Sequence, residues 1–347
     1  MSRQSELAEL SRIYDSSTLS NRNLIINGAM TVAQRGTSVN SSSGSVVYCV
    51  DRMVCFARGS GAATFSQDTD TPSGQGFGYS LKVDVTTADT SLSGNDLYII
   101  DQRLEGQNLQ QLAKGTSGAK QVTVSFWVKS PKTGTHILEL FDDDNTRQIG
   151  QAYTVSSANT WEYKALTFAG DTSGVLDNDN SKSLSVRWFL AAGTDYSSGT
   201  LNTSWVANTT ANRAVGQVNV MDNTANNFYL TGVQLEVGDT ATPFEHRSYG
   251  DELARCQRYY EKETSYDGNS GFWSGDTTGS TVYFMPISFK VEKRASPTIV
   301  ITAENLSNFG SINTSVNTTS GWRTSATSTG TNTSAYFRCQ WTADAEL

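Results

Sequence analysis

Hydrophobic and polar residues alternate with a period of two through much of the chain from Asn23 onward. The pattern is clearest over residues 122–128 and 184–190, where every second residue is apolar. Such alternation predicts β-strands that turn one face toward a core. Further strands are predicted at residues 46–57, 79–85, 97–104, 136–141, 161–168, 216–220 and 228–237.

Short clusters of turn-forming residues separate these segments. Examples are the Ser-Ser-Ser-Gly of residues 41–44 and the Asp-Asp-Asp-Asn of residues 142–145. Because the strands follow one another without intervening helices, they are expected to pair antiparallel. The predicted fold class is therefore all-β, with an antiparallel β-sandwich of the jelly-roll type.

Two segments have helical spacing instead. Leu7, Leu10 and Tyr14 recur at i, i+3 and i+7 near the N-terminus. So short a helix is stable only when it docks on a partner, which favours a role in attachment, although a frayed tail is an equal alternative. Ser248 and Asp251 have the spacing of a capping box, which predicts a connector helix over residues 248–262.

These patterns divide the chain into four parts. The parts are an N-terminal attachment segment (1–22), the jelly roll (23–247), the connector helix (248–262) and a C-terminal β domain (263–347). The last part contains a tract rich in Ser, Thr, Asn and Gly over residues 305–334. This tract is expected to form long loops or thin strands, paired within one subunit or between subunits.

Composition and charge narrow the possible functions. The 347 residues include 10% aromatic residues, which need a core and argue against disorder. The net charge of −8 disfavours binding to nucleic acid. No apolar run could span a bilayer, and the polar N-terminus lacks the core of a signal peptide, so we expect synthesis in a cytoplasm without membrane insertion.

Several stretches of the sequence resemble the opening and closing segments of one known protein family. The opening of that family is matched by Asn-Leu-Ile-Ile-Asn-Gly-Ala-Met at residues 23–30, by residues 32–36 and by Asp51-Arg52. Its closing strand and helix are matched by residues 228–238, 241–245 and 252–260, and the resemblance extends to residues 289–297 and 343–347.

These segments resemble tail-fibre and virion-fibre proteins of tailed bacteriophages, and the resemblance implies a fold and a setting. The fold is a jelly roll similar to carbohydrate-binding modules, followed by a C-terminal β domain for trimerisation. The setting is the virion, where a homotrimer contacts other virion proteins and engages host-surface glycans. Ala29, Met30 and Thr231 stand where such modules often carry carboxylates for a structural calcium, so no metal or cofactor is expected.

Tryptophan residues are the candidate glycan-binding residues. Sugar rings stack their apolar faces on exposed indoles, while amide and hydroxyl groups bind the sugar hydroxyls. The candidates are Trp205, Trp127, Trp273 and Trp322. A place in the core is the alternative for each of them. Leu7, Leu10 and Tyr14 are the candidates for virion attachment.

Candidate catalytic residues are few. Asp142 to Asp144 could supply the paired carboxylates of a glycosidase, and Asp177-x-Asp179 resembles the start of a calcium loop, but solvated turns explain both. No nucleophile motif accompanies the two histidines. The sequence therefore predicts a non-enzymatic tail fibre or receptor-binding adhesin; a capsid head fibre or decoration protein and a polysaccharide depolymerase are the alternatives.

Overall fold

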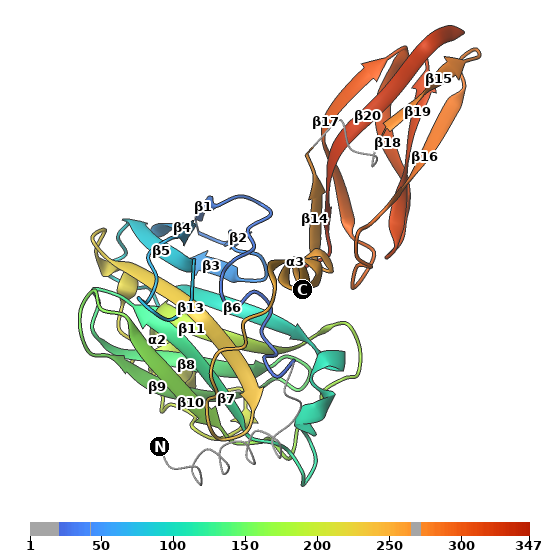
Figure 1. Ribbon diagram of the computed structural model, residues 1–347. Helices are drawn as coiled ribbons and strands as arrows, with labels where there is room; N and C mark the ends of the chain where they lie inside the picture. The colour runs from blue at the N-terminus through green and yellow to red at the C-terminus, as the bar shows by residue number, and fades with distance from the viewer. Residues whose placement is uncertain (1–20, 42, 265–271) are drawn as a thin grey trace. The chain divides into compact units, whose positions relative to one another are not determined.

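The computed structural model describes residues 21–41, 43–264 and 272–347 (Figure 1). The chain divides into two compact units, one ending at Ser248 and the other beginning at Tyr249. Leu7, Leu10 and Tyr14, the predicted attachment residues, lie outside the described residues. Within the described ranges, no helix is both long and apolar enough to cross a membrane.

The first unit contains two antiparallel sheets. The first sheet has the order β1 (Ser38–Ser41), β4 (Ala62–Asp68), β5 (Ser80–Thr87), β13 (Asn227–Val237), β7 (Val122–Lys129) and β10 (Glu162–Phe168). The second has the order β12 (Val206–Ala207), β9 (Arg147–Val155), β8 (Gly134–Asp142), β11 (Lys182–Ala192), β6 (Leu97–Glu105), β3 (Val54–Arg58) and β2 (Ser45–Tyr48). Short helical turns connect them: η1 (Gly106–Asn108), η2 (Gln110–Leu112), α2 (Thr194–Ser197), η3 (Thr210–Asn212) and η4 (Val220–Asp222).

The core of this unit lies between the two sheets. Phe126 of β7 and Trp188 of β11 come from opposite sheets, and their rings meet edge to face at 5.6 Å between centroids. Both side chains are fully buried, and each contributes on the order of 1.5–3 kcal/mol through burial. The prediction of an all-β sandwich from period-two alternation is confirmed.

Some predicted strands differ from those observed. Residues 46–57 form two strands, β2 and β3, which pair as an antiparallel hairpin. Residues 216–220 were expected to form a strand, but this segment lies in loop and turn, with η4 beginning at Val220. A loop containing α2 and η3 covers part of the second sheet, so the apolar cluster with Ile99, Ile137 and Phe189 is buried on its outer face.

The second unit begins with a helix and continues as a smaller β-sandwich. The helix is α3 (Tyr249–Gln257), shorter than the predicted connector because residues 260–263 form a strand. One sheet contains β14 (Tyr260–Glu263), β15 (Phe272–Thr277), β17 (Thr298–Ser307) and β20 (Asn332–Asp344). The other has the order β16 (Val282–Ser288), β19 (Gly321–Ser328) and β18 (Phe309–Asn317).

The polar tract of residues 305–334 forms thin strands within one subunit. β18 contributes Phe309 and Ile312 to the core and β19 contributes Trp322, and the small polar residue Thr324 of β19 is buried as well. Trp322 and Trp341 meet in the core of this unit at 5.9 Å between ring centroids. Lys293 is also buried, and its Nζ donates to Glu261 Oε2 at 2.6 Å.

A buried histidine gives the first unit a pH dependence. His136 Nε2 lies 3.1 Å from the carbonyl oxygen of Lys132, and its ring stacks on Tyr153. Burial lowers the pKa of His136 to about 4, because it penalises the imidazolium form. Below pH 6.5 the unfolded chain therefore binds a proton at His136 that the folded chain does not bind. The free energy of unfolding consequently decreases as the pH is lowered.

We expect His136 to cost about 2 kcal/mol of stability as the medium changes from about pH 7 to about pH 5. Urea denaturation at both pH values measures the effect. The substitution His136→Gln retains a donor for the Lys132 carbonyl but cannot titrate, so its stability should fall less. Equal losses in the natural chain and the variant would contradict the assignment.

Candidate functional site

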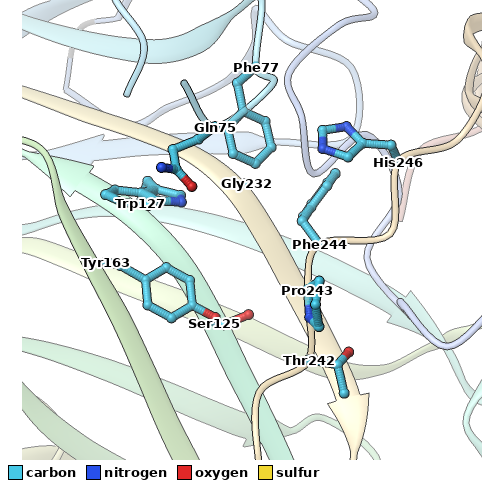
Figure 2. Close-up of a pocket in the computed structure, with 10 residues that line it drawn as sticks. All are labelled: Gln75, Phe77, Ser125, Trp127, Tyr163, Gly232, Thr242, Pro243, Phe244 and His246. Atoms are coloured by element: carbon cyan, nitrogen blue, oxygen red, sulfur yellow. The ribbon is translucent and has the colours of Figure 1, made fainter. Parts of the chain in front are cut away.

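A pocket of about 510 Å³ opens on the outer face of the first sheet of the first unit. Its walls come from β7, β10 and β13 and from two loops, near residues 75–77 and 242–246 (Figure 2). The lining residues are Gln75, Phe77, Ser125, Trp127, Tyr163, Gly232, Thr242, Pro243, Phe244 and His246. Half of them carry aromatic rings, and none is Lys, Arg, Asp or Glu.

Strand alternation explains the part of the pocket that the sheet contributes. In β7, Val124, Phe126 and Val128 point into the core, so Ser125 and Trp127 point outward. Trp127 pairs in register with Tyr163 of β10, and their rings lie 5.4 Å apart. The sheet therefore places two aromatic rings and one hydroxyl side by side.

The two loops contribute a second group of rings. Phe77 lies 5.0 Å from Phe244 and 5.3 Å from His246, and Phe244 lies 4.9 Å from His246, all measured between ring centroids. Figure 2 shows this group on one side of Gly232, with Trp127 and Tyr163 on the other. A ligand in the pocket would therefore have aromatic surfaces on two sides.

Gly232 is required between the two groups of rings. It has φ of +62°, a conformation that L-residues with a side chain rarely adopt. A Cβ atom there would lie 2.7 Å from Phe77 Cζ and 3.1 Å from Trp127 Cδ1. The register of β13 against β7 also shifts at this point, between Thr231 and Gln234. The irregularity leaves room for both rings.

Hydrogen bonds hold the strap, defined here as residues 242–247, against the sheet. The Glu236 carboxylate accepts from the backbone N–H of Thr242 at 2.9 Å and from its hydroxyl at 2.6 Å. The Glu245 carboxylate accepts from the backbone N–H of Asn21 at 2.5 Å and of Asn23 at 2.8 Å. Both acids are thus engaged behind the pocket wall.

Several polar groups of the lining remain available to a ligand. Within the described ranges, no protein group hydrogen-bonds to the side chains of Gln75, Ser125, Tyr163 or His246, or to the indole N–H of Trp127. These groups supply both donors and acceptors, and they carry no formal charge when His246 is neutral. The arrangement suits a ligand with apolar faces and a hydroxylated edge.

The structure places one of the four predicted tryptophans in the pocket. Trp127 lines the pocket, whereas Trp205 packs against the core of the first unit. The indole N–H of Trp205 donates to the Ala169 carbonyl at 2.7 Å, and Lys114 Nζ lies 4.6 Å from the centroid of its ring. Trp273 stacks on Phe337 in the second unit. The prediction for Trp322 is wrong, because its side chain is only 3% exposed within the core.

Sequence reasoning missed most of the remaining lining residues. Tyr163 carried a usable signal, because it occupies an alternating position in a predicted strand and is 45% exposed. Phe77, Phe244 and His246 lie in loops, where no periodicity reveals the direction of a side chain. Their convergence depends on contacts between segments far apart in sequence.

The acidic clusters singled out in the sequence have structural roles. Asp142 is fully buried, forms an ion pair with Lys114 and accepts from the backbone N–H of Asn145 at 2.9 Å. Asp179 accepts from the N–H of Ser181 at 2.8 Å, as in an Asx turn. Across the residues that the structure describes, no group of three or more His, Cys, Asp or Glu side chains could hold a metal ion.

Comparisons with known proteins give only distant structural similarities. No protein-family model and no curated protein matches the chain. Among solved structures, the enzymatically active domain of tailspike protein 4 of bacteriophage CBA120 matches with a TM-score of 0.31 and 10% identity. That match covers 62% of this chain and 22% of the tailspike chain, so it spans about a fifth of that protein.

Two carbohydrate-binding modules match over their whole lengths. The family 11 module of Clostridium thermocellum, in complex with a β-1,3-1,4-mixed-linked tetrasaccharide, has a TM-score of 0.30 and 13% identity, covering 61% of this chain and 99% of the module. The CBM22-1 xylan-binding domain of Paenibacillus barcinonensis has a TM-score of 0.29 and 11% identity, covering 65% and 100%. All three TM-scores are low, and the fold described above rests on the strand pairing of this chain itself.

Proposed function

We propose that this protein is a non-enzymatic, glycan-binding structural protein of a virus particle, and that the pocket on its first sheet binds a sugar residue of a host-surface glycan. The observation that carries the proposal is the convergence of two groups of aromatic rings around unpartnered, neutral polar groups. Aromatic rings pack on the C–H faces of a pyranose, and the polar groups hydrogen-bond to its hydroxyls.

The lining disfavours other ligand classes. Phosphate-bearing ligands such as nucleotides need cationic or clustered backbone donors, and none of the ten lining residues is Lys or Arg. A purely apolar ligand would leave the hydroxyl of Ser125 and the indole N–H of Trp127 without partners. A sugar satisfies both requirements.

Removing the indole of Trp127 tests the glycan-binding site. Full-length protein is applied to an array of neutral and acidic oligosaccharides and polysaccharides, and affinities for the positive spots are measured by calorimetry. Trp127→Ala is expected to weaken binding about ten- to a hundredfold, through loss of roughly 1.5–3 kcal/mol of apolar contact. Phe284→Ala, which removes a 48%-exposed ring from the second unit, is the control and should bind normally.

Two results would contradict this function. Binding that survives Trp127→Ala unchanged would separate the glycan site from the pocket. Shortened polysaccharide chains after incubation with the protein would support a depolymerase instead of a binding protein. The burial of Asp142 against Lys114 supports the non-enzymatic proposal, because that carboxylate is occupied by a structural ion pair.

The proposed setting is a tail fibre that assembles as a homotrimer, and the resemblance of the opening and closing segments to phage fibre proteins supports it. Light scattering of the purified protein should give three times the mass of one chain. Density of an assembled particle would identify the contacts of residues 1–30. Contacts with the capsid instead of the tail would favour a head fibre or decoration protein.

A further inference from the structure

Ser125 presents a hydroxyl to the pocket, to which no side chain or backbone group of the described residues hydrogen-bonds. The residue is 3% exposed and lines the pocket. Its Oγ is open to the pocket and is not one of the inaccessible polar atoms that lack a partner, so the hydroxyl is available to a ligand. A ligand group that reaches Ser125 would supply a hydrogen-bond partner.

The neighbours of Ser125 cannot take its place. Gln234 is its partner in register on β13, and Ala165 is its partner on β10. The Gln234 amide donates to Glu236 Oε1 at 2.8 Å, and its oxygen accepts from the backbone N–H of Glu245 at 2.8 Å. Ala165 has no polar group in its side chain. Ser125 is therefore the group in this row of the sheet that can bind a ligand hydroxyl.

Charges of both signs lie behind this end of the pocket, because the Arg22 guanidinium donates to the carbonyl of Pro243, a lining residue, at 2.6 Å. The Glu236 carboxylate lies directly behind Thr242, a lining residue, and is held there by the two hydrogen bonds from that residue. None of the ten described lining residues is Lys or Arg, so none compensates a second negative charge. A carboxylate on a ligand would lose hydration in the pocket without gaining an ion pair with a lysine or arginine of the described lining.

We propose that Ser125 determines specificity by hydrogen-bonding to a hydroxyl of an uncharged sugar residue, and that the pocket rejects sugars that carry a carboxylate. This inference rests on the proposed glycan-binding function and adds the class of sugar to it. Uronic acids and sialic acids are excluded, and neutral hexoses and pentoses are accepted.

The test compares each acidic polysaccharide with its own carboxyl-reduced form, which has the same backbone without the charge. The probes are polygalacturonate, polyglucuronate and polymannuronate, each before and after reduction of its carboxyl groups to alcohols. Full-length protein is titrated with all six. At least one reduced form should bind, and should do so at least tenfold more tightly than its acidic parent.

Two serine variants complete the test. Ser125→Ala should weaken binding of the reduced form about three- to tenfold, the effect of one neutral hydrogen bond, without lowering the melting temperature. Ser66→Ala, on β4 of the same sheet and outside the pocket, should leave affinity unchanged.

The outcomes separate the inference from the function beneath it. Equal or tighter binding of an acidic parent, or normal affinity of Ser125→Ala, would overturn the inference while leaving glycan binding intact. Failure of all six probes, together with a blank array, would overturn the glycan-binding function and the inference with it.

Discussion

Replacing Asp171 by Ala is expected to lower the free energy of unfolding by about 2–3 kcal/mol, because Lys114 and Arg147 both lose a charged hydrogen-bond acceptor. Asp171 is 3% exposed. Its carboxylate accepts from Lys114 Nζ at 3.0 Å and from Arg147 Nε at 2.7 Å. Lys114 keeps Asp142 in the variant, but Arg147 loses its bidentate partner.

Acid should have the same effect on the natural chain. Burial raises the pKa of Asp171, but hydrogen bonds from Arg147 and Lys114 outweigh burial and hold the pKa below its ordinary value of 3.8. The stabilisation is thus present at neutral pH and is lost as the pH falls below that value. Urea denaturation of the variant at neutral pH measures the first effect.

Asp177→Ala is the matched control. Asp177 is an exposed aspartate in the turn that follows Asp171, and its replacement should change stability by no more than about 0.5 kcal/mol. A loss below about 1 kcal/mol in Asp171→Ala would show that the ion cluster contributes little, as exposed pairs do. Normal stability together with altered polysaccharide cleavage would instead point to a catalytic role for these acids.

Replacing Gly232 by Val is expected to abolish measurable glycan binding and to cost about 2–5 kcal/mol of stability, the sum of backbone strain and overpacking. Valine would have to adopt the positive φ of this position, which its branched side chain disfavours. Its side chain would also displace Phe77 or Trp127, which are only 2.7 Å and 3.1 Å from the position of the Cβ. Calorimetric titration and thermal denaturation measure the two effects.

Gly279 provides a control for the backbone alone. It has φ of +59°, nearly that of Gly232, but a Cβ there would meet no atom within 4 Å. Gly279→Val should therefore destabilise the second unit through strain and leave glycan affinity unchanged. If Gly232→Val bound glycans as well as Gly279→Val does, the rings beside Gly232 could not form the binding site.

The part of the pocket on the strands was predictable, and the part on the loops was not. The period of two in residues 122–128 predicts that Ser125 and Trp127 share a face opposite Phe126, and the structure places them so. Alternation alone does not predict whether the outward face of a strand is exposed to solvent or covered by a loop. Phe189 occupies an outward position by the same rule, yet it is buried because a loop packs over its sheet.

The errors over tryptophan have a common physical origin. Trp205 and Trp322 both stand in polar stretches of the sequence, and such a neighbourhood does not by itself predict an exposed side chain. In β19, Thr324 and Ser325 are buried together with Trp322, so a polar stretch of the sequence can belong to the core. Trp205 lies in a loop, but its indole nitrogen binds a carbonyl and its ring packs under Lys114.

The anchoring of Glu245 has a mechanical consequence. One carboxylate joins the backbone of Asn21 and Asn23 to the strap, and Asn23 Nδ2 also donates to the Val233 carbonyl of β13 at 3.1 Å. Tension entering the chain at residue 21 is thus divided between the strap and the central strand before it reaches the rest of the sheet. The strap, which carries Phe244 and His246, would therefore bear part of that tension.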